Sequence, residues 1–320
     1  MFAKSGLEWS TSRAFERRSA FAYAILSSVI SLVSLTFLLT DYEFSNDGFF
    51  ERAGFLLVVG ACGWFTRGFG MARTATLLEA FAVMAGFALP IFLACALLAA
   101  TGNPLIDSQL IAIDRLLGFD WLLLNELLKG YPSVFKYGEI VYLTLRWQPT
   151  ILLLLLAVML RHQHLWQYIT AWFVTLVIAL AIFPFTPAVG GFIHYGIDHN
   201  DLPYLSEASI SGWHDIFESV RNGDVTKLGS NTITGIVTFP SFHAAGAVLL
   251  AYGYMAIKWI RWPMLILNIG LFFSSIIIGG HYLVDVIAGG LIAVVAILIV
   301  KRLPYLRDED QPQPAPDRSD

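Results

Sequence analysis

One segment of the sequence places an imidazole and a carboxylate on the same face of a helix. Residues 279–285 read Gly-Gly-His-Tyr-Leu-Val-Asp, in which His281 and Asp285 are four residues apart. Side chains at this spacing are neighbours on a helix surface. A carboxylate beside a histidine can hold the ring in one tautomer and raise its basicity, as it does in catalytic triads. The pair could therefore act as a nucleophile and the group that orients it.

A second segment adds another histidine at the start of an apolar stretch. Residues 239–245 read Phe-Pro-Ser-Phe-His-Ala-Ala, so Pro240 marks a break and Ser241 can cap the helix that follows. A helix N-terminus presents unpaired N–H groups and a positive dipole, which suit an anion such as phosphate. In nucleophilic transfer, one histidine would attack and His243 would protonate the leaving group.

The composition of the whole chain is that of an integral membrane protein. It has 320 residues, 57% of them hydrophobic and 14% charged, with a mean hydropathy of +0.66. Soluble domains have about 45–50% apolar and about 25% charged residues, so this chain has too few charges to cover a soluble globule of its size. The composition excludes a soluble enzyme, a nucleic-acid-binding protein and a disordered protein.

Eight apolar stretches are candidates to cross a hydrocarbon core of ~30 Å. We expect helices, because a lipid-exposed backbone must satisfy its own hydrogen bonds. The predicted fold class is therefore all-α, a polytopic membrane protein with about eight transmembrane helices. The eight stretches are 19–40, 49–65, 76–100, 137–160, 165–183, 243–257, 263–278 and 282–300.

The basic residues predict how these helices are oriented. With a cytoplasmic N-terminus, most of the 20 basic residues fall on the cytoplasmic side, and the outer segment 41–48 carries none. His243 and His281 then both lie near the outer surface, at similar depth. Each histidine alone is better explained as an ordinary interfacial residue. Together, His243, His281 and Asp285 favour a function, because buried charge in a membrane is costly. We predict a plasma or bacterial inner membrane protein with its active site on the non-cytoplasmic face.

Two long outer segments separate the apolar stretches. Residues 101–136 have the pattern of an interfacial helix, with Leu116 and Leu117 beside charged residues such as Asp114. Residues 184–238 form the largest loop, and loops of this length in compact proteins are usually functional or disordered. Glycines 190 and 191 in this loop are expected at the surface.

Zinc is a weaker alternative for the two histidines and the aspartate. Three ligands and an open position can form a catalytic zinc site, but no tight ligand spacing is present in the sequence. We therefore predict no metal and no other cofactor.

The two segments resemble signatures of a known family. Pro240-Ser241-Phe242-His243 is similar to the second signature of the type 2 phosphatidic acid phosphatase superfamily, which is usually Pro-Ser-Gly-His. Gly280-His281-Tyr282-x-x-Asp285-x-x-x-Gly289 is similar to its third signature. The combination most resembles the inositolphosphorylceramide synthase-like branch, an inositolphosphotransferase group.

The resemblance implies the roles of the three polar residues. It implies that His281 forms a phosphohistidine, that Asp285 orients it, and that His243 is the general acid. It also implies a six-helix catalytic core. The expected organisation is two N-terminal transmembrane helices in 1–75, a catalytic six-helix membrane domain in 76–302 and a disordered cytoplasmic tail in 303–320.

The chain departs from the family where the phosphatases bind phosphate. Their first signature, Lys-x6-Arg-Pro, is absent, and Ser275 stands where they carry an arginine before the nucleophilic histidine. Lys136 and Arg146 are the nearest substitutes, although Arg146 could equally pair with Glu139 on the same helix stripe. The expected substrate-binding residues are Ser241, Arg146, Lys136 and Tyr282. Arg221 and Lys227 are loop cations that could fold over the site.

The predicted function is hydrolysis or transfer of a lipid phosphate or phosphodiester. Its partners would be that substrate, membrane lipids and an alcohol acceptor in the case of transfer; no nucleic acid is expected. A non-catalytic lipid-binding relative is disfavoured because both histidines and the aspartate are retained. The alternative is a polytopic transporter of a small or lipid substrate, with a polar pathway through Glu79, Glu139, Arg146 and Asp285.

Overall fold

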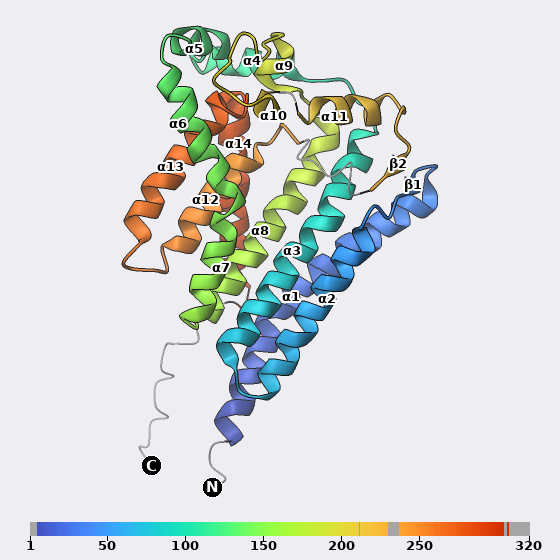
Figure 1. Ribbon diagram of the computed structural model, residues 1–320, viewed down its shortest axis with the longest axis vertical. Coiled ribbons are helices and arrows are strands. Elements are labelled where there is room, and N and C mark those ends of the chain that lie inside the picture. The colour runs from blue at the N-terminus through green and yellow to red at the C-terminus, as the bar shows by residue number, and fades with distance from the viewer. Residues whose placement is uncertain (1–4, 211, 230–236, 304–305, 307–320) are drawn as a thin grey trace, which may run out of the picture.

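Seven helices and an eighth that is broken by a bend form an elongated bundle in the computed structural model, which describes residues 5–210, 212–229, 237–303 and 306 (Figure 1). The bundle helices are α1 (Ser5–Leu39), α2 (Phe49–Gly68), α3 (Ala72–Ala99), α6 (Pro132–Leu143), α7 (Gln148–Val158), α8 (His162–Ile182), α12 (Phe242–Tyr254), α13 (Arg261–Ile277) and α14 (Leu283–Arg302). A 3₁₀ turn, η1 (Thr144–Arg146), joins α6 to α7.

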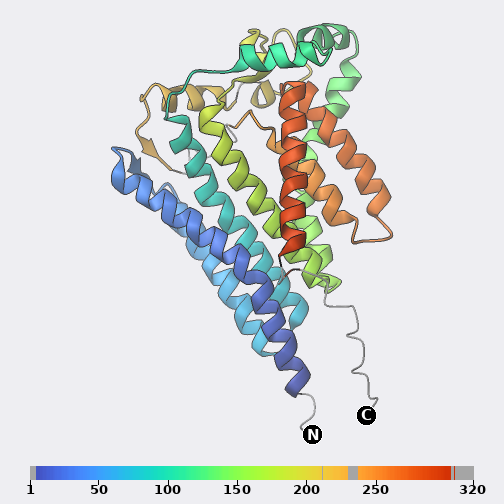
Figure 2. The same cartoon turned by 180° about the vertical axis from the view of Figure 1, so that it is seen from behind.

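Short helices cover one end of this bundle, which we call the capped end. They are α4 (Asp107–Leu116), α5 (Trp121–Leu128), α9 (Gly190–His194), α10 (Glu207–Ile210) and α11 (His214–Arg221), with a 3₁₀ turn η2 (Phe183–Phe185). Two strands, β1 (Glu43–Phe44) and β2 (Lys227–Leu228), pair in parallel and join the α1–α2 connection to the long loop. In both views α4, α5 and α9 lie across the top, while α1 begins and α14 ends toward the opposite end (Figures 1 and 2).

The helices coincide with the eight predicted apolar stretches, which confirms an all-α polytopic membrane fold. Within the described chain, five helices are long and apolar enough to cross a membrane, or six when the bent pair α6–α7 is one span. Helices α12, with 13 residues, and α13, with 17, are shorter. The predicted tail 303–320 lies outside the described residues except for Leu303 and Leu306.

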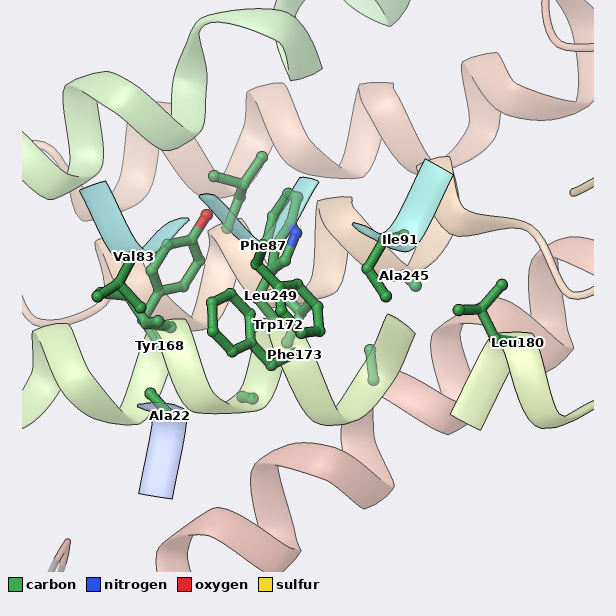
Figure 3. Close-up of a cluster of buried hydrophobic side chains, with 14 of the residues drawn as sticks. Ala22, Val83, Phe87, Ile91, Tyr168, Trp172, Phe173, Leu180, Ala245 and Leu249 are labelled. Atoms are coloured by element: carbon green, nitrogen blue, oxygen red, sulfur yellow. The ribbon is translucent and has the colours of Figure 1, made fainter. Parts of the chain in front are cut away.

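Helix α8 is the centre of the apolar core. The rings of Phe87 on α3 and Phe173 on α8 stack with centroids 3.7 Å apart. Trp172 on α8 turns toward α12, where Ala245 and Leu249 are buried (Figure 3). Since α8 also contacts α1 and α14, the N-terminal helices and the helices that carry the histidines are packed on one shared element.

The predicted helix 137–160 is broken by a bend of 48°. Pro149 explains the break, because proline lacks an N–H group and its ring clashes with the carbonyl four residues before it. A buried polar network stabilises the bend: Gln148 donates to Thr144 Oγ1 (2.7 Å) and accepts from Asn268 Nδ2 (2.9 Å). Tyr254 on α12 donates to the Gln148 carbonyl at 3.0 Å. The network therefore ties the bend to both α12 and α13.

The interfacial helix predicted in 101–136 corresponds to α4, whose buried side includes Asp107 and Asp114. Asp114 on α4 points inward and is 2% exposed, whereas Leu116 and Leu117 are 87% and 55% exposed. The polar side of α4 faces the protein because backbone N–H groups of α14 bind Asp114 there. Amphipathic periodicity shows that a helix has two faces, but not which of them is buried.

Asn268→Ala should destabilise the bundle by about 1–2 kcal/mol, because it leaves the Gln148 acceptor buried without a donor. The midpoint of thermal unfolding in detergent measures the effect. Thr150→Ala, on the exposed side of α7, is the matched control and should leave the midpoint unchanged. Equal midpoints for the two variants would show that the network does not stabilise the bend.

Candidate active site

The two predicted histidines lie next to each other at the capped end of the bundle. His243 is in the first turn of α12, and His281 is two residues before α14 begins. Their ring centroids are 6.3 Å apart, with 49° between the ring planes. His281 is buried, with 5% of its surface exposed. The fold therefore brings together two residues that are 38 positions apart in the sequence.

Asp285 holds one side of the His281 ring. Its Oδ2 lies 3.5 Å from His281 Nδ1, and the same oxygen accepts the Tyr282 backbone N–H at 3.0 Å. Asp285 is fully buried, so the contact is shielded from water. With Nδ1 facing the carboxylate, Nε2 is the ring nitrogen of His281 that is available to a substrate.

The turn before His281 is shaped by hydrogen bonds to the backbone. The Ser275 carbonyl accepts the N–H groups of Gly279 (3.1 Å) and His281 (3.3 Å). Gly280 has a φ of +64°, a left-handed conformation that favours glycine. Its carbonyl accepts the Gly191 N–H at 2.7 Å. Ser275, at the position of the phosphatases' arginine, therefore contributes a backbone acceptor here, and its hydroxyl donates within its own helix.

Gly190 and Gly191, expected at the surface, are buried in the start of α9. A Cβ atom on Gly190 would lie 3.0 Å from the Gly280 carbonyl oxygen, and one on Gly191 would meet the Trp121 ring. The two glycines allow α9 to approach both the histidine turn and α5 closely. Local polarity alone could not reveal this contact, because Gly280 and Trp121 are distant in the sequence.

Two aspartates on α4 anchor the segment that follows His281. Asp107 accepts the Tyr282 hydroxyl (2.9 Å) and also backbone N–H groups at the start of α9. Asp114 accepts the N–H groups of Leu283 and Val284, both at 2.8 Å. Burial raises the pKa of the Asp114 carboxyl, and these two hydrogen bonds oppose that shift. The buried Tyr282 side chain thus binds Asp107, and the first N–H groups of α14 are already occupied.

Helices α12 and α14 cross at Ser241. The Ser241 N–H donates to the Asp285 carbonyl at 3.0 Å, and its hydroxyl accepts the Ala244 N–H at 3.3 Å, which confirms the predicted cap. A Cβ on Gly289 would collide with the Ser241 carbonyl oxygen. The N–H groups of Phe242 and His243 have no hydrogen-bond partner in the described part of the chain. The start of α12 therefore offers free N–H donors beside the histidines.

The last turn of α6 contributes a tyrosine and an arginine. Tyr142 stacks on His243 with centroids 4.0 Å apart, and its hydroxyl lies 3.1 Å from His243 Nδ1. One turn further on, Arg146 is exposed at the bend and close enough to interact electrostatically with His243 and Glu139. Glu139 accepts three hydrogen bonds from Ser206 and Ser209. Among the described residues Arg146 forms no ion pair, and its interaction with Glu139 is electrostatic at longer range.

The remaining predicted cations are not at the histidines. Lys136 is exposed on α6, and because it is six residues from Tyr142 it faces about 120° away around the helix. Arg221 donates to the Asn103 carbonyl (2.9 Å) beside the end of α3. Lys227 lies exposed in β2.

The polar residues of the transporter hypothesis are held in separate contacts. Glu79 pairs with Arg67 between α3 and α2, while Glu139 binds loop serines and Asp285 faces His281. Over the described ranges, no three His, Cys, Asp or Glu side chains are placed to share a metal ion.

Sequence reasoning missed the roles of Asp107 and Asp114. Their spacing of seven residues places them on one face of α4, which was an available sign of an inward polar face. Tyr142 lies on the same helix stripe as Glu139 and Arg146, at spacings of three and four residues. Its contact with His243 depends on the packing of α6 against the end of α12, which the stripe does not define.

These features define a polytopic α-helical membrane protein with a histidine pair and an aspartate at one end of the bundle. The family model of the PAP2 superfamily matches residues 108–299, from α4 to the last turns of α14, and the chain belongs to this superfamily. The match includes both histidine segments and confirms the predicted superfamily; the inositolphosphotransferase-like branch stays a prediction. No curated protein and no solved structure matches the chain.

Gly289→Ala should separate α12 from α14, because the added methyl group meets a backbone carbonyl that has no rotamer with which to move aside. We expect a loss of about 1–3 kcal/mol in stability, as for other overpacked sites, and a larger loss of activity. Thermal unfolding in detergent measures the first. Gly86→Ala, where the new methyl group meets open space, is the control. If Gly289→Ala and Gly86→Ala unfolded at the same temperature, close packing at the crossing would not limit the stability of the protein.

Proposed function

We propose that this protein is a lipid phosphatase or phosphotransferase that acts through a phosphohistidine intermediate. The observation that carries the proposal is the contact of His281 with buried Asp285 beside a second histidine, His243. Membership of the PAP2 superfamily supports phosphoric ester chemistry of this kind.

In the first step, His281 attacks the phosphorus of a lipid phosphate or phosphodiester. The lone pair of Nε2 forms the N–P bond while the bond from phosphorus to the leaving oxygen breaks. Asp285 accepts the Nδ1–H and stabilises the positive charge that develops on the ring. His243 gives a proton to the leaving oxygen, so that an alcohol departs.

In the second step, an acceptor oxygen attacks the phosphohistidine. His243, now neutral, removes the acceptor's proton, the O–P bond forms and the N–P bond to His281 breaks. From a lipid phosphate, water as acceptor releases inorganic phosphate and an alcohol forms a new phosphate monoester. From a phosphodiester, water forms a phosphate monoester and an alcohol forms a new phosphodiester. The synthase-like form of the two signatures, and Ser275 in place of the phosphatases' arginine, favour transfer.

Free donors at the start of α12 and the cation at the α6–α7 bend are the candidate phosphate-binding groups. The unpaired N–H groups of Phe242 and His243 can bind phosphoryl oxygens at a helix N-terminus. Arg146 adds a full positive charge close to His243. Both belong to a protein with membrane-spanning helices, so a substrate phosphate attached to a lipid would reach them at the membrane surface. By the distribution of basic residues this is the non-cytoplasmic face.

Substitution of the histidines tests the reaction. His281→Ala should abolish turnover of phosphatidic acid and of phospholipid diesters in mixed micelles, because no nucleophile is left. His243→Ala should lower it by roughly 10²–10⁴-fold, the usual contribution of a general acid. Inorganic phosphate released from phosphatidic acid indicates hydrolysis, and a new phosphodiester formed from a phospholipid diester and an added alcohol indicates transfer.

His194→Ala, on the exposed side of α9, is the matched histidine control and should keep full activity. Mass spectrometry of quenched wild-type protein should find a phosphoryl group on the peptide that contains His281. Full turnover by purified His281→Ala would overturn the proposal. Flux of an uncleaved lipid phosphate across vesicles would instead support a transporter.

Arg146→Ala should weaken substrate binding, since it removes a charge-assisted contact to phosphate. A contact of about 1.5–3 kcal/mol corresponds to a KM increase of roughly 10–100-fold, and Arg146→Lys should recover part of it. Arg52→Ala, an exposed arginine at the start of α2, is the control for loss of one positive charge. An unchanged KM in Arg146→Ala would leave phosphate binding to the helix N-terminus alone.

A further inference from the structure

The hydroxyl group of Tyr142 lies beside Nδ1, the ring nitrogen of His243 that faces the protein. Tyr142 Oη lies 3.1 Å from His243 Nδ1, and the two rings stack at 14° with centroids 4.0 Å apart. The stack fixes the plane of the imidazole, and the hydroxyl fixes which edge faces the protein. Asp285 faces the equivalent nitrogen, Nδ1, of His281.

We propose that Tyr142 is the positioning residue for His243, so that only Nε2 of His243 exchanges a proton with the substrate. This inference rests on the proposed function of the site. A tyrosine hydroxyl can both donate and accept a hydrogen bond, whereas a carboxylate can only accept. The hydroxyl can therefore stay on Nδ1 in either protonation state of the ring.

The proton balance of the two steps is consistent with this partner, whose oxygen accepts the Nδ1–H in both protonation states of the ring. In the protonated ring, Nδ1–H donates to the Tyr142 oxygen and Nε2–H points to the leaving oxygen. When the bond from phosphorus to that oxygen breaks, the Nε2 proton moves to it and His243 becomes neutral with Nδ1–H still bound to Tyr142. Nε2 then takes the proton of water or an alcohol as the N–P bond to His281 breaks. Tyr142 itself gains and loses no proton.

The chemical difference between the two partners fits the two roles. A carboxylate beside His281 stabilises the positive charge that this nucleophile acquires on attack. The same carboxylate beside His243 would hold the proton that a general acid must release. A neutral hydroxyl orients the His243 ring and adds no charge. This suits His243, which acts as an acid in the first step and as a base in the second.

The position of Tyr142 is determined by the end of α6. It is in the last turn of the helix, two residues before Thr144, where the buried Gln148–Asn268 network begins. Gly138, one turn earlier, lies against Ile278 on the segment that leads to His281. The helix that carries Tyr142 is therefore packed against the histidine turn as well as against α12.

Tyr142→Phe removes the hydroxyl and keeps the stacked ring. Rates are compared for phosphatidic acid, which has a poor alkoxide leaving group, and for 4-nitrophenyl phosphate, whose leaving group departs without protonation. We expect kcat on phosphatidic acid to fall roughly 10–100-fold, which is a fraction of the usual contribution of a general acid. The KM should change less than about twofold. The rate on 4-nitrophenyl phosphate should fall less than about threefold.

Two tyrosine variants are matched controls. Tyr137→Phe alters an exposed tyrosine two residues before Glu139 on the same helix and should resemble wild type. Tyr254→Phe removes a buried hydroxyl that donates to the Gln148 carbonyl and should affect both substrates equally. The ratio of the two rates does not depend on how much protein is folded, so a loss of stability in Tyr142→Phe cannot mimic the expected result.

A double-mutant cycle on phosphatidic acid provides a second readout. If Tyr142 acts through His243, Tyr142→Phe should have no further effect in a His243→Ala background. An equal loss on both substrates, or an additive loss in the cycle, would overturn the positioning role while leaving the phosphohistidine reaction intact. Wild-type protein that cleaves neither substrate would overturn the proposed function, and this inference with it.

Discussion

The close crossing of α12 and α14 is the contact on which the geometry of the site depends. The Ser241 N–H binds the Asp285 carbonyl, and Gly289 lies against the Ser241 carbonyl. Apolar side chains provide little drive for helix association in lipid, so small residues that permit close packing are decisive. Because each histidine is at or just before the start of one of these helices, the crossing sets the separation of His243 and His281. Gly289 thus positions the reacting groups although it carries no chemistry.

The two helix starts at this crossing differ in how their N–H groups are satisfied. Asp114 of α4 accepts the first N–H groups of α14, while those of Phe242 and His243 at the start of α12 have no partner in the described chain. An unsatisfied N–H in apolar surroundings is costly, so it persists where water or a ligand can reach it. The difference supports our proposal that phosphate binds at the start of α12 rather than at the start of α14. Asp114 also rigidifies the segment that follows His281.

Composition and local spacing predicted the parts of this protein that depend on local physics. The thickness of a bilayer sets the length of an apolar helix, and the helices are at the predicted places. The four-residue spacing of His281 and Asp285 predicted their contact, but the shared helix face was wrong, because His281 lies before α14 begins. In contrast, Asp114 binds Val284, 170 residues away, and no local pattern reveals such a partner. The α6–α7 bend was similarly missed, because an apolar stretch that contains Pro149 still has the composition of one span.

Two cations of the capped end are paired with acids, Arg115 with Asp120 and Lys129 with Glu126, but two carboxylates near the histidines bind neutral donors instead. Glu139 accepts hydrogen bonds from Ser206 and Ser209, and Asp107 from Tyr282 and from backbone N–H groups, so neither carboxylate needs a cation. Arg146 is consequently left without an acid partner in the described structure, at a bend within an apolar span. Arg146 therefore keeps a positive charge near the histidine pair that no ion pair of the described residues takes up, which supports our proposal that it binds the substrate phosphate.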